Sequence, residues 1–199
     1  MRKSRKYRGC LAPDKYLSAE QVKKLRIYLR SMGEKNRAKV SEAMIDLMLN
    51  TGLRTEEVIN LRMKDMPHYH GKFFVNVFKG KGNVNRAVAV SAKFAARMNK
   101  FVNYYRKNSK PNSFLFVNED RQQFSYRSIY SRISIIGKRV GIKITPHMLR
   151  HTYAMQYYAN TKDLFGLQQQ LGHADTRTTH IYAKTNDETL RQQIELFDL

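Results

Sequence analysis

The stretch 145–150 places an imidazole and a guanidinium three residues apart at the expected start of a helix. Thr145 can cap the first free amides and Pro146 fits the first helical position, so we expect a helix to begin here. His147 and Arg150 would then share one face near the partly positive end of that helix. An arginine fork binds two phosphate oxygens at once, and an imidazole can add a hydrogen bond or exchange a proton. The pair therefore suits a phosphodiester, although an ordinary solvated helix face has the same spacing.

A second guanidinium, that of Arg54, follows Gly52 at the expected start of a short helix. Gly52 should end the preceding helix in a left-handed cap, and a threonine cap with two acidic residues should open the next one. Glu57 stands three residues after Arg54, so its carboxylate can hold the guanidinium in one orientation. A surface Arg–Glu pair has the same pattern and contributes little to stability. The local pattern alone leaves both interpretations open.

A β-hairpin with a basic tip is expected in the middle of the chain. Residues 72–79 and 84–90 are rich in Phe and Val, and a Gly-Lys-Gly-Asn turn separates them. The glycines allow the backbone to approach another surface closely, and Lys81 lies between them. Lys79 and Arg86 add positive charge on either side. The lysine of such a tip can act as a mobile general acid, or the tip can be an ordinary solvated turn.

Hydrophobic periodicity and capping residues predict helices for most of the remaining chain. They are expected from Ser18, over 37–49, from Ser91 to about Arg106, from Ser125 to Val140, from Pro146 to about Asn160, from Asp163 to Leu171, over Thr178–Ala183, and from Asn186. The fold class is therefore mixed, mainly α-helical with one small antiparallel β-hairpin. We expect one domain over 17–185, preceded by a basic flexible arm (1–16) and followed by a terminal helix (186–199) that docks on its own domain or on a neighbouring copy.

The charge balance predicts a polyanionic partner. The net charge is +21, spread along the chain and enriched in the first eight residues, and such a balance attracts nucleic acid in a salt-dependent way. The expected helix after Ser125 carries a basic face that could follow a DNA groove. Its basic residues are Arg127, Arg132, Lys138 and Arg139, and Lys79 and Arg86 of the hairpin are further expected DNA contacts. No long apolar run follows the basic start, so neither a membrane span nor export is supported, and we expect a cytoplasmic protein.

Few residues suit a disulfide or a metal. Cys10 is the single cysteine, which excludes an internal disulfide framework and a cysteine-rich zinc site. His68 and His70 could suggest a metal site, but no third ligand stands at a usable spacing, and a solvated loop is the favoured alternative. We therefore expect chemistry that uses neither a metal nor a cofactor.

Four separated motifs occur in one order: Thr-Gly-Leu-Arg at 51–54, Gly-Lys-Gly at 80–82, His-Met-Leu-Arg-His-Thr-Tyr-Ala at 147–154, and Leu-Gly-His at 171–173 followed by Tyr182. The order and the residues of these motifs resemble those of the tyrosine recombinase (phage integrase) family, over residues from about 17 to 185. Four ordered motifs at compatible spacings are far more specific than any single one. The domain over 17–185 is accordingly identified as similar to a tyrosine recombinase catalytic domain.

The resemblance implies a role for each matching residue. Tyr182 matches the nucleophile, which attacks a DNA phosphate to form a 3′-phosphotyrosine and release a 5′-hydroxyl. The other matches are Arg54 and Arg150 as clamps on the non-bridging oxygens, Lys81 as the general acid, His147 and His173 as supporting hydrogen-bonding residues, and Glu57 as the acid that orients the site. Because a phosphotyrosine conserves the bond energy, strand rejoining would need neither ATP nor a metal.

The chemistry of these side chains agrees with the implied roles. A phenol with a pKa of about 10 is ionised to roughly one part in a thousand at neutral pH, so the site must ease proton loss and neutralise charge on phosphorus. Guanidiniums keep their protons and act as fixed stabilisers, and losing one such donor typically lowers the rate about a hundred- to a thousandfold. Lysine suits proton donation because nearby cations lower its pKa.

The amino-terminal part of this sequence differs from that of the larger members of the family. Those members carry a separate helical domain that closes over the other face of the DNA, whereas almost nothing precedes Ser18 here. Two explanations stay open: a small single-domain member that inverts short promoter segments, or a catalytic fragment. Either explanation changes how tightly the protein is expected to hold DNA, and neither changes the expected chemistry.

The resemblance also implies partners and a setting. We expect double-stranded DNA as substrate, a homo-oligomer (a tetramer) on that DNA, accessory DNA-bending proteins, and a nucleoid location in a prokaryotic, phage or plasmid context. The event itself would be integration, excision or inversion. Two other functions remain open, DNA relaxation by a type IB topoisomerase-like enzyme and regulation by a catalytically idle DNA-binding protein. The second is disfavoured because no expected catalytic position is substituted.

Overall fold

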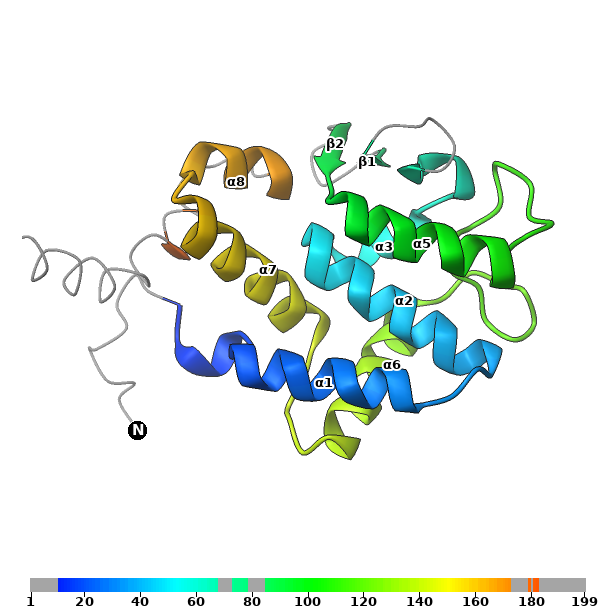
Figure 1. Ribbon diagram of the computed structural model, residues 1–199, viewed down its shortest axis with the longest axis horizontal. Helices are drawn as coiled ribbons and strands as arrows, with labels where there is room; N and C mark the ends of the chain where they lie inside the picture. The colour runs from blue at the N-terminus through cyan, green and yellow to red at the C-terminus, as the bar shows by residue number, and fades with distance from the viewer. Residues whose placement is uncertain (1–10, 68–72, 79–84, 173–178, 180, 183–199) are drawn as a thin grey trace, which may run out of the picture.

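The computed structural model describes residues 11–67, 73–78, 85–172, 179, 181 and 182. In chain order the elements are η2 (Pro13–Lys15), α1 (Ala19–Ser31), α2 (Asn36–Thr51), α3 (Thr55–Asn60), η3 (Met63–Asp65), β1 (Phe74–Val77), β2 (Arg86–Ala89), α5 (Ala92–Tyr105), α6 (Tyr126–Arg139), α7 (Pro146–Thr161) and α8 (Leu164–Leu171). This part of the chain is mainly α-helical with one two-stranded antiparallel sheet, which confirms the predicted fold class (Figure 1).

Side-chain caps begin the helices where the sequence predicted them. Ser18 forms a capping box with Gln21 ahead of α1. The simpler form, in which the side chain accepts a bond from the amide three residues on, occurs at Ser91, Ser125, Thr145 and Asp163 ahead of α5, α6, α7 and α8. Each cap satisfies an amide that the helix itself leaves without a partner. α7 therefore begins at Pro146, which places Arg150 in its second turn.

The core is built around α2, which contacts α1, α5, α6 and α7 (Figure 1). Met44, Leu47 and Met48 of α2 are fully buried, since helices cover this element on several sides. Because these contacts hold α2, its carboxyl end at Gly52 lies at a fixed place beside α7.

A smaller apolar cluster lies between α7, α8 and the two ends of the described chain. Its buried members are Leu11, Tyr153, Ala154, Leu167, Leu171 and Tyr182. The Leu17 amide donates to Thr152 Oγ1 of α7 at 2.9 Å, which ties the segment after η2 to the same helix. Within residues 11–16, Leu11 is buried and Tyr16 packs against the cluster, whereas Pro13, Asp14 and Lys15 are exposed. The bounds of the expected basic arm stay a prediction.

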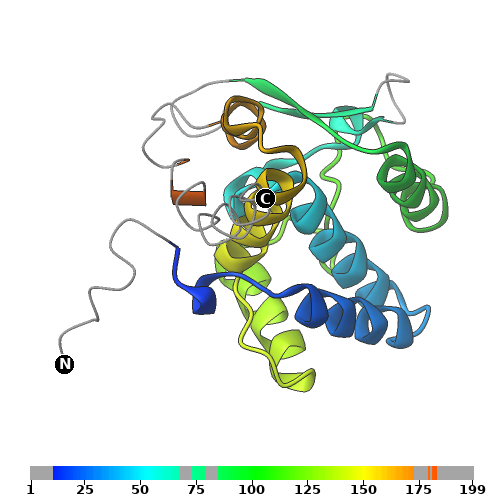
Figure 2. The same ribbon diagram turned by 60° about the vertical axis from the view of Figure 1, so that its left-hand side comes forward.

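The predicted hairpin is present and its strands are shorter than expected. β1 and β2 pair antiparallel, with Phe74 opposite Ala89 and Val77 opposite Arg86. Val75 and Val88 are opposite one another and fully buried. The hairpin tip lies outside the described residues. β2 contacts α8 (Figure 2). Arg86 of β2 donates through Nε to the carbonyl oxygen of Gln170, near the carboxyl end of that helix.

One local expectation differs from the structure. The residue that caps α3 is Arg54, and the expected threonine cap is wrong, because Glu57 reaches back to accept the Arg54 amide at 2.8 Å and satisfies the helix start from the third position. Near the other end, Thr179, Ile181 and Tyr182 are helical, whereas the helix expected from Asn186 lies outside the described residues. None of the described helices is long and apolar enough to cross a membrane.

Gly52 ends α2 in the left-handed conformation, with a φ of 62°. A Cβ atom added there would lie 2.4 Å from Cδ1 of Tyr153 and 2.9 Å from Cδ2 of Leu171. Gly33 also has a positive φ, 82°, but a Cβ atom there would meet nothing within 4 Å. Of these two glycines, only Gly52 is also closely approached by other side chains, at the place where α2, α7 and α8 meet.

We predict that Gly52→Ala destabilises the fold more than Gly33→Ala. The left-handed conformation costs an L-residue about 1–2 kcal/mol at either position. Crowding against Tyr153 and Leu171 should add about 1–3 kcal/mol at Gly52 only. Urea denaturation of the two variants measures the difference, and equal losses would show that the close approach carries no energetic weight.

Candidate active site

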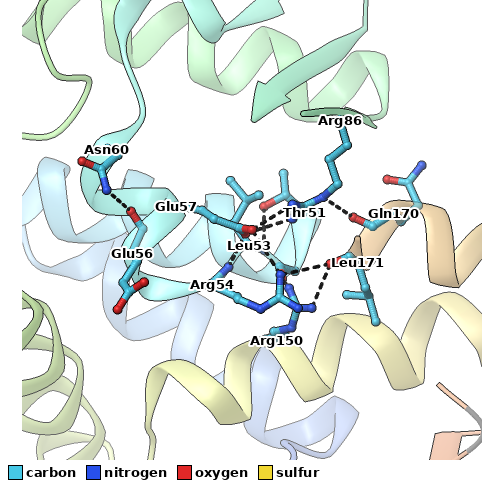
Figure 3. Close-up of polar contacts among 11 residues, drawn as sticks. Thr51, Leu53, Arg54, Glu56, Glu57, Asn60, Arg86, Arg150, Gln170 and Leu171 are labelled. Carbon is cyan, nitrogen blue, oxygen red and sulfur yellow. Dashed lines mark hydrogen bonds and ion pairs between the residues drawn. The ribbon is translucent and has the colours of Figure 1, made fainter. Parts of the chain in front are cut away.

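The Arg150 guanidinium lies buried where three helices meet (Figure 3). Its Nη1 donates to the carbonyl oxygen of Gly52 at the end of α2, and its Nη2 donates to that of Leu171 at the end of α8, at 2.9 Å. These carbonyls carry the partial negative charge of helix carboxyl ends, so they stabilise a cation. Burial lowers the pKa of Arg150 to about 10, so the group remains protonated at neutral pH.

Arg54 and Glu57 lie beside Arg150 at the start of α3 (Figure 3). Arg54 Nη1 donates to Oε1 of Glu57 at 3.2 Å, and at 3.5 Å it reaches the same Leu171 carbonyl oxygen that binds Arg150. The Arg54 side chain is 25% exposed, whereas Arg150 is 4% exposed. Arg54 is therefore the more accessible of the two guanidiniums.

The main partner of Glu57 is Arg86 on β2, which the sequence analysis assigned to DNA contact. Nη1 and Nη2 of Arg86 donate to the two Glu57 carboxylate oxygens at 2.8 and 2.9 Å, and Nε donates to the Gln170 carbonyl oxygen at 3.1 Å. Only 9% of the Arg86 side chain is exposed. The structure thus gives Arg86 a positioning role, in which one side chain ties the sheet to α3 and α8.

The Glu57 carboxylate is charged in spite of its burial. Burial by itself raises the pKa of this carboxyl, but the hydrogen bonds and charge of Arg86, together with the Arg54 amide and guanidinium, outweigh that effect and hold the pKa below its ordinary value. A charged Glu57 between two arginines lowers their mutual repulsion. It therefore orients both guanidiniums, as the sequence predicted for Arg54 alone.

Tyr182 lies in the smaller apolar cluster and is 1% exposed. Its hydroxyl lies 2.8 Å from Nδ1 of His151 on α7. Burial raises the pKa of the Tyr182 phenol, while the positive charges of Arg150 and Arg54 act in the opposite direction. The phenol oxygen is therefore within electrostatic reach of both guanidiniums.

Two histidines stand one helical turn apart on α7, and only the first was singled out from the sequence. His147 is exposed, and its ring stacks on that of His151 with 6.1 Å between the centroids. Burial, with the positive charges of His147, Arg150 and Lys15, lowers the pKa of His151 to about 4, so this imidazole is neutral at pH 7. The spacing of four residues from His147 was the signal that could have identified His151.

The basic face expected on α6 is only partly open to a partner. Arg127, Lys138 and Arg139 are exposed, although Arg139 Nη1 also donates to the Tyr28 hydroxyl at 3.3 Å. Arg132 instead turns toward the protein. Its Nη1 donates to the Arg37 carbonyl oxygen at 3.2 Å and to Ser41 Oγ at 3.0 Å, and its guanidinium lies over the Phe124 ring.

Three predicted site residues, Lys79, Lys81 and His173, lie outside the described residues. Among the residues that are described, no group of three or more His, Cys, Asp or Glu side chains is placed to hold a metal ion. What the described site offers is the adjacent guanidiniums of Arg54 and Arg150, one carboxylate that is hydrogen-bonded to Arg54, and a phenol bonded to an imidazole. Such a set can bind the non-bridging oxygens of a phosphodiester beside an oxygen nucleophile.

We predict that Arg86→Gln lowers the free energy of unfolding by about 3 kcal/mol, because it leaves the Glu57 carboxylate buried without its two-bond partner. Arg97→Gln is the matched control, since the Arg97 side chain is 46% exposed and removing its pair with Asp46 should cost at most about 1 kcal/mol. Urea denaturation measures both losses. Combining Arg86→Gln with Glu57→Gln should recover part of the loss, and strictly additive losses would show that the two side chains are not coupled.

We also predict that His151 makes stability depend on pH between 6.5 and about 4. In the unfolded chain its imidazole binds a proton as the pH falls through 6.5, whereas in the folded protein it remains neutral down to about 4. The unfolded state then binds more protons, so the free energy of unfolding decreases as the pH falls through this window. His151→Asn carries no titrating group, and its free energy of unfolding should decrease less over the same window. Equal decreases would contradict the lowered pKa.

Known proteins resemble this chain in sequence. The chain matches the model of the phage integrase family over residues 15–189. It is 30% identical over 189 residues to tyrosine recombinase XerA of Pyrococcus furiosus, across 93% of this chain and 62% of that protein. It is 33% identical over 162 residues to tyrosine recombinase XerD of Listeria monocytogenes serotype 4b, across 78% of this chain and 54% of that protein. The chain thus spans less than two thirds of the length of these relatives.

Solved structures resemble it in fold. The crystal structure of XerA recombinase superposes with a TM-score of 0.77 at 32% identity, across 92% of this chain and 65% of that one. The structure of XerH site-specific recombinase bound to difH substrate, a pre-cleavage complex, gives a TM-score of 0.73 at 25% identity, across 89% of this chain and 52% of that one. Four motifs in the expected order, a shared fold and a family match over most of the sequence lead to one conclusion: the chain belongs to the phage integrase family of tyrosine recombinases.

Proposed function

We propose that this chain carries the catalytic centre of a site-specific DNA recombinase, in which Tyr182 attacks a phosphodiester of double-stranded DNA. The observation that supports this most is the meeting of Arg54, Arg150 and Tyr182 from three separate parts of the chain. Arg54 and Arg150 donate to one carbonyl oxygen, that of Leu171, and the positive charges of both partly offset the burial that raises the pKa of the Tyr182 phenol. A surface Arg–Glu pair or a solvated helix face would not bring these groups together.

The guanidiniums supply the charge that the reaction needs. As the Tyr182 oxygen bonds to phosphorus, negative charge gathers on the two non-bridging oxygens, and fixed cations that are already oriented stabilise it without reorganising. Arg150 remains protonated, because even its lowered pKa of about 10 lies well above neutral pH. Arg54, which is the more exposed, would meet the phosphate first and Arg150 would close on it from the protein side.

Atoms and charge balance in the proposed step. The phenol oxygen forms a bond to phosphorus, the bond from phosphorus to the 5′ oxygen breaks, and the phenol proton passes to solvent water. Lys81 is proposed to protonate the leaving 5′ oxygen, and His147 and His173 are proposed to support the phosphate by hydrogen bonds. Attack by the 5′-hydroxyl of another strand reverses the step and completes strand exchange, so the phosphotyrosine conserves the energy of the broken bond.

Access to the nucleophile requires a change in packing. Tyr182 is 1% exposed, so a phosphate can bond to it only after the surrounding apolar cluster opens. We propose that DNA binding drives this change, which would tie cleavage to assembly on the DNA. A homo-oligomer on paired sites, with accessory proteins, extends the same proposal.

The first test is covalent capture of DNA by the 199-residue chain. The probe is a pool of nicked duplexes with randomised half-sites, in which cleavage releases a short strand and traps the protein on the rest. Tyr182→Phe should abolish the adduct that survives denaturation and leave DNA binding unchanged, because only the hydroxyl is removed. Tyr153→Phe is the matched control, since its hydroxyl lies in the same cluster and makes only a 3.4 Å contact with Gln170; it should retain capture.

The outcomes separate the three functions. Adducts that depend on Tyr182, followed by joining of strands from two different duplexes, are expected for a recombinase. Relaxation of a supercoiled plasmid by a single protomer without paired sites would instead favour a type IB topoisomerase. Binding without any adduct in the wild-type protein would favour a DNA-binding regulator, and an adduct in Tyr182→Phe would disprove the proposed nucleophile.

A further inference from the structure

The Tyr182 hydroxyl has a specific partner that the family motifs did not single out. It lies 2.8 Å from Nδ1 of His151, and the two rings are tilted by 53° with 5.8 Å between their centroids. His147, which matches the motif histidine, is exposed and contacts His151 through its ring. The imidazole that touches the phenol is therefore the second histidine of α7.

The surroundings of His151 keep its imidazole neutral. The charged and titratable groups that face it are His147 and Arg150 from α7, Lys15 from η2 and Tyr182 itself. Burial, acting with His147 and with the charges of Arg150 and Lys15, lowers the pKa of His151 to about 4. A neutral imidazole has one bare nitrogen, so the tautomer with its proton on Nε2 can accept the Tyr182 O–H at Nδ1.

The position of His151 on the helix links it to the phosphate clamp. His151 follows Arg150 directly, and both side chains leave the second turn of one rigid helix. Arg150 is held by the carbonyl oxygens of Gly52 and Leu171, so the backbone that carries His151 is held as well. One helical turn thus holds the Arg150 cation, which would bind the phosphate, at a fixed distance from the His151 acceptor, which binds the phenol.

We propose that His151 is a positioning residue, which aims the Tyr182 hydroxyl toward the Arg54–Arg150 site by accepting its hydrogen bond at Nδ1. This role rests on the proposed function of Tyr182 as nucleophile. A misplacement of about 1 Å in a reacting group can lower a rate a hundredfold, so the loss of this acceptor should lower the rate of cleavage. His151 need not take the proton, because the hydrogen bond alone restricts the direction of the phenol oxygen.

A pair of substitutions separates positioning from proton transfer. In His151→Asn the amide oxygen can occupy the place of Nδ1 and accept the same bond, although it cannot be protonated. In His151→Ala no acceptor remains. With the nicked duplex that gives the strongest Tyr182-dependent adduct, we expect His151→Ala to lower the single-turnover rate of adduct formation about ten- to a hundredfold, and His151→Asn to remain within about fivefold of wild type.

Three outcomes of that experiment would overturn the proposal. An unchanged rate in His151→Ala would remove any role for the bond, and a faster rate would show that the bond restrains the nucleophile. A rate in His151→Asn as low as in His151→Ala would show that the imidazole itself is required. DNA binding measured on both variants distinguishes these results from a loss of folding, and far-ultraviolet circular dichroism confirms that each variant is folded.

The hydrogen bond can also be tested without any reaction. Long-range 1H–15N correlation spectra of the full chain report which ring nitrogen of His151 carries the proton. We expect a bare Nδ1 at pH 7 whose 15N resonance shifts in Tyr182→Phe, whereas a protonated Nδ1 or an unchanged shift would overturn the proposal. If the bond is present and the wild-type protein forms no adduct, the proposed function has failed and the contact between His151 and Tyr182 stands.

Discussion

Two guanidiniums that repel one another lie side by side in this structure, and the carbonyl oxygen of Leu171 holds them there. Arg150 donates to it at 2.9 Å and Arg54 approaches it at 3.5 Å, while the Arg54 charge lowers the pKa of Arg150. The carboxyl end of a helix is a natural place for cations, because its last carbonyls carry partial negative charge. Glu57 supplies the full negative charge that completes the balance.

The remaining architecture serves to bring that helix end, the start of α3 and α7 to one place. α2 is buried on several sides and ends at Gly52, whose left-handed conformation and close contact with Tyr153 let α7 and α8 approach. Arg86 joins the sheet to Glu57 and to the last turn of α8 (Figure 3). These contacts hold in place the elements that carry the two guanidiniums.

Sequence reasoning succeeded where the signal was local. The caps at Ser18 and Thr145 and the glycine end at Gly52 involve residues within a few positions, so propensity and spacing predicted them. The contact of Arg86 with Glu57 joins residues 29 apart, and that of His151 with Tyr182 joins residues 31 apart. No local pattern specifies such pairs, because packing of whole elements decides them, and for this reason Arg86 was assigned to DNA and His151 was overlooked.

The central claim is that the phenol of Tyr182 and the two guanidiniums act on one phosphorus atom. The most direct measurement is mass spectrometry of the trapped protein–DNA adduct after nuclease and trypsin digestion, since cleavage after Arg177 and Lys184 gives a peptide in which Tyr182 is the single tyrosine. The account predicts a nucleotide attached through phosphate to that peptide, at Tyr182. Attachment to any other residue would contradict it.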